Sequence, residues 1–123
     1  MTYLPVDASG KVALSDLERN ICDDTVLIST MLANNEIGTI QDIKAMAAVA
    51  HDHGVLFHTD AVQAIGAMPL NVKKLHADML SLSAHKFHGP KGTGLLYIRS
   101  GTVLQPLIHG GAQESGRFHG NLS

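Results

Sequence analysis

Two different spacings of hydrophobic residues alternate along this chain. Intervals of three and four predict an amphipathic helix over residues 42–53 that ends at Gly54. The residues that make up this repeat are Ile43, Met46, Ala47 and Ala50. Residues 25–32 form a nearly continuous hydrophobic run rich in β-branched side chains, which predicts a strand buried on both faces. The pattern therefore indicates a chain that mixes helices and strands.

Shorter patterns predict the remaining elements. Ser15 and Glu18 have the spacing of a capping box, so a short helix is expected over about residues 15–20. A weak helical turn is expected over residues 72–76. The other expected strands cover residues 2–6, 55–58, 79–82 and 94–99. Because this alternation is typical of βαβ units, we expect an α/β fold with a central, mostly parallel sheet flanked by helices.

Composition narrows the class of protein. The 123 residues suit one ordinary domain, and 45% hydrophobic with 16% charged residues is typical of a globular chain. A net charge of −2 gives no overall positive field, which argues against nucleic acid or a membrane surface as the partner. The hydrophobic runs are too short to span a bilayer. Cys22 is the single cysteine, so a reducing, cytoplasmic compartment is expected.

Polar residues follow three of the expected strands. Asn35, Asp60 and residues 83–86 each come shortly after a strand along the chain. Ligands of parallel sheets gather at the carboxyl ends of the strands. We therefore expect these polar groups to face one shared crevice.

Lys86 and Asp60 have the chemistry that pyridoxal phosphate (PLP) requires of a protein. Because the cofactor supplies the electron sink, the protein needs a lysine for the Schiff base and an acid that keeps the pyridine nitrogen protonated. Lys86 is the candidate lysine, and partial desolvation near other cations would favour its nucleophilic amine form. An exposed loop lysine is the plain alternative. Asp60 is the candidate partner of the pyridine nitrogen, although a carboxylate there also suits the N-cap of a following turn.

Four more polar residues are candidates for contacts with the cofactor. Ser83 and His85 can donate hydrogen bonds to a phosphate, from a hydroxyl and from a ring N–H. Gln63 can donate to the same pocket, with simple surface exposure as its alternative. Asn35 can reach a ligand hydroxyl, or it can serve the sharp turn that Asn and Gly favour. The histidines form no convincing set of ligands, so no metal site is predicted.

Four ordered motifs closely resemble the class V aminotransferase family. They are residues 32–39 (LANNEIGT), 58–63 (HTDAVQ), 81–86 (SLSAHK) and 89–92 (GPKG). More narrowly, they look like the cysteine desulfurases that serve iron–sulfur cluster assembly. The resemblance covers nearly the whole chain. It implies that residues 1–123 are a partial large, PLP-binding domain of a fold type I enzyme.

The resemblance also implies an activity and roles for the candidate residues. Such an enzyme works as a homodimer, converts L-cysteine to L-alanine, and passes the sulfur as a persulfide to an acceptor or scaffold protein. By motif, Lys86 is the Schiff-base lysine and later proton carrier, and Asp60 pairs with the pyridine nitrogen. Ser83 and His85 bind the phosphate. The residues on the side of the ring hydroxyl are Asn35 and Gln63.

The chain departs from the family pattern in ways that predict an inactive fragment. The glycine-rich phosphate loop and the histidine that stacks on the cofactor ring are expected before residue 1, and the nucleophilic cysteine after residue 123. Phe118 and Asn121 stand where the family has an arginine and a threonine, as in a truncated or frameshifted gene product. Two alternatives stay open: a selenocysteine lyase, and a non-catalytic remnant or interaction fragment.

Overall fold

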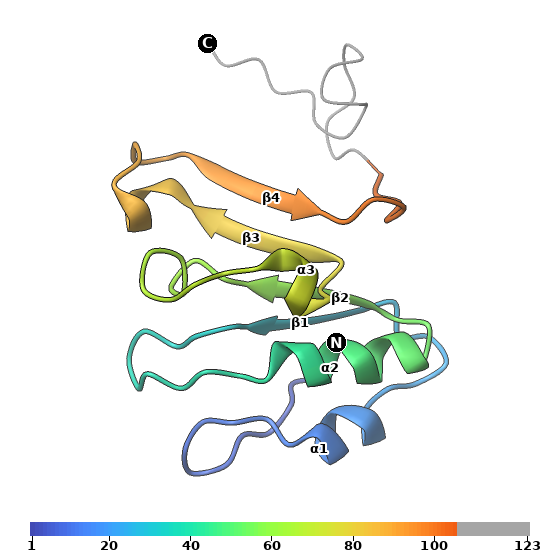
Figure 1. Ribbon diagram of the computed structural model, residues 1–123. Coiled ribbons are helices and arrows are strands. Elements are labelled where there is room, and N and C mark those ends of the chain that lie inside the picture. The colour runs from blue at the N-terminus through green and yellow to red at the C-terminus, as the bar shows by residue number, and fades with distance from the viewer. Residues whose placement is uncertain (106–123) are drawn as a thin grey trace.

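The structure is a computed structural model that describes residues 1–105 (Figure 1). These residues form a sheet with the strand order β1, β2, β3, β4. The strands are β1 (Leu27–Met31), β2 (Leu56–Asp60), β3 (Met79–Ser83) and β4 (Gly94–Ile98). β1, β2 and β3 run parallel, whereas β4 pairs antiparallel with β3. The predicted α/β fold with a mostly parallel sheet is therefore confirmed. The departures at Phe118 and Asn121 lie outside the described residues.

The α-helices lie on one side of this sheet, and a short 3-10 helix lies in the connection between β3 and β4. They are α1 (Leu14–Arg19), α2 (Ile43–Asp52), α3 (Val72–Leu75) and the 3-10 helix η1 (Ala84–Phe87). In Figure 1, α2 and α3 lie over the same face, and α1 packs beside α2. The core lies between these helices and the sheet and includes the buried side chains of Phe57, Met46 and Leu80. Among the helices within residues 1–105, none combines the length and the hydrophobicity that crossing a membrane requires.

α2 forms where the hydrophobic repeat predicts it. The side chain of Asp42 accepts a hydrogen bond from the backbone N–H of Ala45 (3.1 Å) and so caps the first turn. The buried residues of the helix are those of the repeat: Ile43, Met46, Ala47 and Ala50. Gly54 follows the helix with φ +70°, a left-handed conformation that favours glycine. The predicted helix over residues 42–53 is confirmed to within one residue at each end.

The strand predicted over residues 2–6 is wrong. These residues have no strand structure, and the side chains of Tyr3 and Val6 are exposed. Pro5 lacks the N–H group that a strand residue donates to its neighbour, which disfavours sheet pairing in this segment. Most of the segment instead lines a hollow of about 840 Å³ beside β1, a hollow that contains neither Lys86 nor Asp60.

The strand predicted over residues 25–32 exists as β1, but its burial on both faces is wrong. Ile28 is 8% exposed, whereas Leu27 and Met31 are 46% and 39% exposed. Within the described residues β1 is an edge strand covered on one face, so every second side chain points away from the core. A run of hydrophobic residues does not reveal how many faces of its strand are covered, and this explains the error.

The capping box predicted for α1 is also wrong. The helix begins at Leu14, its N-cap position is Ala13, and no side chain caps the first turn. Ser15 therefore lies inside the helix, where its hydroxyl is misplaced for the predicted cap. The elements predicted at 55–58, 72–76, 79–82 and 94–99 are confirmed, with ends shifted by no more than two residues.

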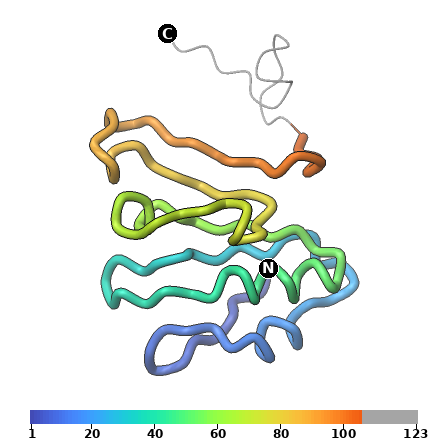
Figure 2. Tube along the Cα trace, viewed as in Figure 1, coloured from blue at the N-terminus to red at the C-terminus, as the bar shows by residue number. Residues whose placement is uncertain are grey.

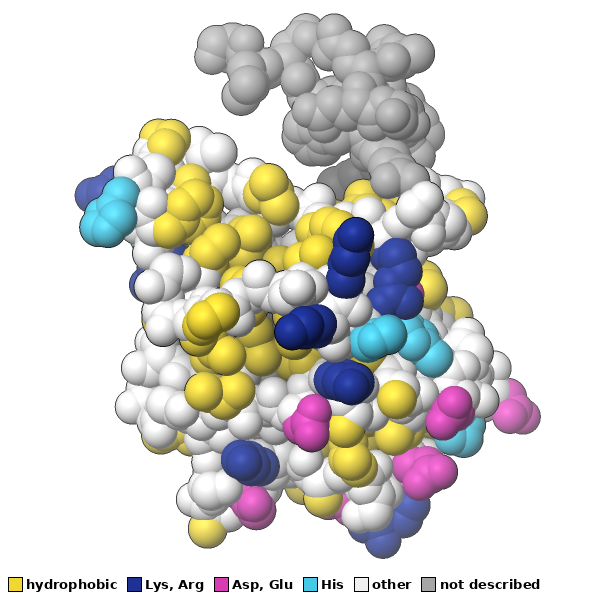
Figure 3. Space-filling view, in the orientation of Figure 1, with side chains coloured by type: hydrophobic (Ala, Val, Ile, Leu, Met, Phe, Trp, Pro, Cys, Tyr) yellow, Lys and Arg dark blue, Asp and Glu magenta, His cyan; other side chains and the backbone are white. Residues whose placement is uncertain are grey.

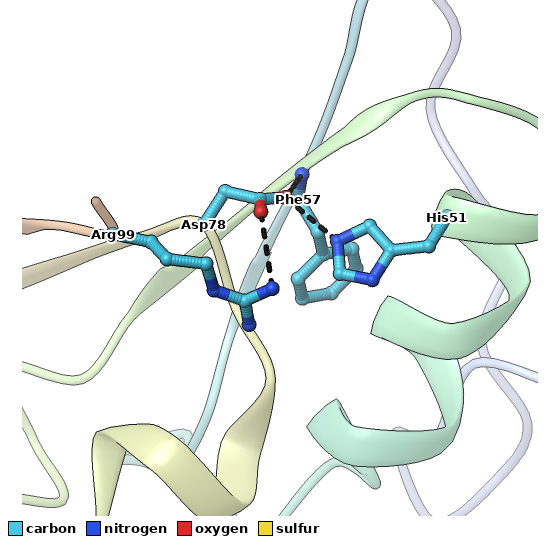
Figure 4. A network of polar contacts seen from close by, with 4 residues as sticks. All are labelled: His51, Phe57, Asp78 and Arg99. Carbon is cyan, nitrogen blue, oxygen red and sulfur yellow. Dashed lines mark hydrogen bonds and ion pairs between the residues drawn. The ribbon is translucent and has the colours of Figure 1, made fainter. Parts of the chain in front are cut away.

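Asp78 joins three elements at the amino-terminal end of β3 (Figure 4). Its Oδ2 accepts a hydrogen bond from the backbone N–H of Phe57 on β2 (2.8 Å) and lies 2.8 Å from Nε2 of His51 on α2. Its Oδ1 lies 3.5 Å from Nη1 of Arg99, which follows β4. The Asp78 side chain is only 8% exposed, so these partners offset the cost of burying its charge.

Replacing Asp78 by alanine is expected to lower the free energy of unfolding by about 2–4 kcal/mol. The change leaves the Phe57 N–H without its acceptor and Arg99 without its buried partner. Urea unfolding followed by circular dichroism measures the effect. Asp23→Ala is the control, because Asp23 is exposed in a turn. Equal stabilities of the two variants would contradict the structural role given to Asp78.

Candidate active site

The carboxyl ends of β1, β2 and β3 meet at one edge of the sheet. Asp60, the last residue of β2, pairs with Met31 of β1 and with Ser81 of β3. The Leu32 N–H donates to the Asp60 carbonyl (2.8 Å), and the Ala61 N–H donates to the Ser81 carbonyl (3.0 Å). Figure 2 shows the loops that follow these three strands on the left side of the view. The structure confirms that the three strand ends lie side by side, whereas a crevice shared by their polar side chains stays a prediction.

Asp60 is half-buried at this edge. Its Oδ1 accepts a hydrogen bond from the Val62 N–H (2.9 Å), which is the local turn that the alternative interpretation of this carboxylate anticipates. The ion pairs formed within residues 1–105 do not include Asp60. Its negative charge is therefore available to a cation outside this part of the chain.

Ser83 ends β3, and η1 follows with His85 and Lys86. The hydroxyl oxygen of Ser83 lies 2.7 Å from Nδ1 of His85, within hydrogen-bonding distance. The Ala84 N–H donates to the Thr93 carbonyl (3.0 Å), which closes the connection between β3 and β4. This turn groups a hydroxyl, an imidazole and an amine within four residues.

The partial desolvation expected for Lys86 is wrong for the described part of the chain. Its side chain is exposed, as is that of His85. The physical reason is its position, because the turn between β3 and β4 lies beyond α2 and α3 in Figure 1. The exposed amine of Lys86 is accessible to a ligand.

Asn34 rather than Asn35 builds the turn after β1. Its Oδ1 accepts hydrogen bonds from the N–H groups of Glu36 (2.9 Å) and Ile37 (3.1 Å). Asn35 is exposed beside it, and Gln63 is half-buried in the turn after β2. The structural task of the turn thus belongs to Asn34, which leaves the Asn35 side chain for other contacts.

Two glycines hold the turn that carries Lys86, and the sequence patterns did not identify Gly66 as one of them. Gly66 has φ +80°, and a Cβ atom there would lie 3.3 Å from the carbonyl oxygen of Lys86. A Cβ atom on Gly89 would lie 2.7 Å from the Cβ of Ala84. The Gly89 N–H donates to the Ala84 carbonyl (2.8 Å). The loop after β2 therefore approaches the Lys86 backbone closely, and this requires a residue without a side chain.

Replacing Gly66 by alanine is expected to displace the backbone around Lys86. The added methyl group meets the Lys86 carbonyl, and φ +80° is unfavourable for alanine. We expect altered amide resonances for Lys86 and Phe87 and a loss of about 1–2 kcal/mol in the free energy of unfolding. Gly54→Ala is the matched control, since Gly54 has φ +70° and no atom near its missing Cβ. If both variants shift the Lys86 resonance equally, the contact has no effect.

His58 joins the three parallel strands just behind this edge. Its Nδ1 lies 2.8 Å from Oγ of Ser29 on β1, and its Nε2 lies 2.8 Å from Oγ of Ser81 on β3. Burial lowers the pKa of His58, and the nearby Asp60 raises this pKa by a smaller amount. The ring is therefore neutral near pH 7 and donates one hydrogen bond while accepting another. His58 is not among the residues predicted to form the site.

The side chains at this edge fit a phosphorylated pyridine aldehyde. Lys86 has an amine that can react with an aldehyde, and Asp60 has a carboxylate for a protonated ring nitrogen. The hydroxyl of Ser83 and the imidazole of His85 lie together and suit a phosphate. The fold and this edge define an α/β domain of the kind that binds a ligand at the carboxyl ends of parallel strands.

The chain belongs to the class-V aminotransferase family, because the sequence model of that family matches residues 1–120. It is 59% identical over 120 residues to the cysteine desulfurase IscS of Methanosarcina thermophila. It is 55% identical over 120 residues to the cysteine desulfurase IscS of Dictyoglomus turgidum. Each match covers 98% of this chain and 30% of the relative, so the chain spans about a third of the length of these relatives. Both relatives are named cysteine desulfurases.

Solved structures share the fold of this chain. A NifS-like protein is 50% identical with a TM-score of 0.89, over 97% of this chain and 33% of that protein. SspA, solved in complex with cysteine, is 45% identical with a TM-score of 0.89, over 97% of this chain and 35% of that protein. The predicted resemblance to cysteine desulfurases is therefore confirmed at the level of family and fold.

Proposed function

We propose that residues 1–123 form part of the large PLP-binding domain of a cysteine desulfurase. The whole enzyme converts L-cysteine to L-alanine and passes the sulfur on as a persulfide for iron–sulfur cluster assembly. The observation that carries the proposal is the position of Asp60 at the end of β2 and of Lys86 in η1, directly after the adjoining β3, in a chain 59% identical to a cysteine desulfurase. The IscS name of two relatives supports cluster assembly as the use of the sulfur.

Each candidate residue has a defined task in this proposal. PLP, when bound, supplies the electron sink for cleavage of the carbon–sulfur bond. Lys86 holds the cofactor through its side-chain amine and later carries a proton. Asp60 keeps the proton on the ring nitrogen by offering it a nearby negative charge. The other proposed contacts are Ser83 and His85 at the phosphate, and Asn35 and Gln63 on the side of the ring hydroxyl.

The proposal includes a homodimer and a sulfur-accepting or scaffold protein as partner. Uncovered hydrophobic surface supports further protein contacts: Leu95 and Phe87 are 56% and 42% exposed. Figure 3 shows hydrophobic side chains gathered on the surface over β3 and β4. L-cysteine is the proposed substrate, in keeping with the cysteine bound to the related SspA. The free thiol of Cys22 suits the reducing cytoplasm, where we place the enzyme.

The experiment that tests this function transfers the chain into a full-length relative. In this chimera, residues 1–105 replace the matching segment of the Methanosarcina thermophila desulfurase. We expect the chimera to release alanine from cysteine when PLP is supplied. We expect no alanine from the 123-residue chain alone, because it spans about a third of the relative. A chimera without activity, beside an active parent enzyme, would contradict the proposed function.

A further inference from the structure

We propose that His58 is a positioning residue for the cofactor-binding edge, because it ties β1 and β3 to β2 and leaves Asp60 without a competing cation. This inference rests on the proposed function, since it assigns a task toward the ligand of Asp60. His58 is not among the residues that we propose to contact the cofactor. It acts through its neighbours.

The first part of the argument is the geometry of the hydrogen-bonded row. The hydroxyl oxygens of Ser29 and Ser81 lie 2.8 Å from the two ring nitrogens, so all three strands are joined through a single imidazole. Ser81 is also the strand partner of Asp60. The hydrogen bond between His58 and Ser81 therefore holds the residue that lies beside Asp60 on the neighbouring strand. A fixed Ser81 therefore helps to set the spacing between β2 and β3 where Asp60 lies.

The second part of the argument is charge. Side chains alternate between the faces of a strand, so His58 and Asp60 project from the same face of β2. The ring of His58 is hydrogen-bonded to β1 and β3 through the uncharged side chains of Ser29 and Ser81. Asp60 is the charged group that acts on the pKa of His58 in the part of the chain that the structure describes. Burial has the larger effect, so the pKa is lowered despite this carboxylate.

The consequence concerns the charge that Asp60 offers to a ligand. A protonated His58 would place a positive charge two residues away on the same face and would compensate the carboxylate there. A neutral ring leaves the full negative charge for the protonated nitrogen of a pyridine. Because a hydroxyl can donate or accept, the neutral ring can donate to one serine and accept from the other, and both of its nitrogens are satisfied.

The first experiment observes His58 directly in the 123-residue chain. Two-bond ¹H–¹⁵N correlation spectra of the histidine rings are recorded across pH, and His58→Gln identifies the signal. We expect a titration midpoint below the ordinary value of about 6.5. We expect Ser29→Ala to shift the signal of Nδ1, since it removes the hydroxyl beside that nitrogen. A midpoint at or above 6.5, or ring signals that Ser29→Ala leaves unchanged, would overturn the proposal.

The second experiment measures the affinity of the chimera for PLP as a function of pH. As the pH falls through the midpoint of His58, the ring becomes positive, and we expect the affinity to fall on the order of tenfold. The amide of His58→Gln can donate and accept hydrogen bonds but does not titrate. We therefore expect this variant to lack the part of the pH dependence that His58 causes. Identical pH profiles for the two proteins would overturn the proposal.

Failure of the proposed function has a different signature. A chimera that binds no PLP and releases no alanine at any pH rejects the function itself. A chimera that is active, with a pH profile that His58→Gln does not change, rejects only the role of His58. The spectra of the 123-residue chain report on the ring in either case.

Discussion

A Lys86→Arg variant of the chimera is expected to release alanine from cysteine about 10²–10⁴-fold more slowly than the unmodified chimera. Arginine keeps the positive charge, but its guanidinium does not deprotonate and cannot replace the reactive amine. The absorbance of enzyme-bound PLP should change together with the rate, because the covalent attachment is lost. A steady-state assay of alanine and an absorption spectrum of the same sample measure the two effects.

Lys91→Arg is the matched control for this change. Lys91 lies in the same connection between β3 and β4 and is also exposed. We expect this variant to keep the rate and the spectrum of the unmodified chimera. If Lys86→Arg behaves like Lys91→Arg, then Lys86 is the exposed loop lysine of the plain alternative.

An Asp60→Asn variant of the chimera is expected to lose about 10²–10⁴-fold in rate while the backbone around residue 60 stays intact. The amide oxygen can still accept the hydrogen bond that Val62 donates to Asp60, so the local turn is preserved. The amide carries no negative charge, so the ring nitrogen loses its proton more easily and the electron sink weakens. The rate is measured with PLP in excess, so that weaker binding does not hide the chemical effect.

Asp23→Asn is the control for the loss of one negative charge. Asp23 lies in an exposed turn and contributes no ion pair within residues 1–105. A normal rate for this variant and a reduced rate for Asp60→Asn are expected. If Asp60→Asn keeps the full rate, the carboxylate has no role at the ring nitrogen.

The parts of the fold that depend on local spacing could be predicted from the sequence. α2 follows from its hydrophobic repeat, with Asp42 at its start and Gly54 after its end. The burial of β1 could not be predicted in this way, because Leu27 and Met31 are hydrophobic yet face away from the core. Burial depends on which elements cover a strand, and that is a property of the assembled fold.

The candidate site shows the same division. Asp60 and Ser83 were predicted to converge because both follow strands of a parallel sheet, and strand order places their ends at one edge. Gly66 and His58 were missed, because their importance depends on a close approach and on strand register. No sequence pattern distinguishes this glycine in a loop or this histidine in a strand. Only the folded structure shows that Gly66 lies against the Lys86 backbone and that His58 lies beside Ser81.

The site of covalent attachment of PLP tests the central claim most directly. The chimera is incubated with PLP, reduced with borohydride, digested, and its peptides are sequenced by mass spectrometry. The account predicts a phosphopyridoxyl group on Lys86. A label on another lysine, such as Lys91, or an active chimera whose Lys86 stays unlabelled, would contradict it.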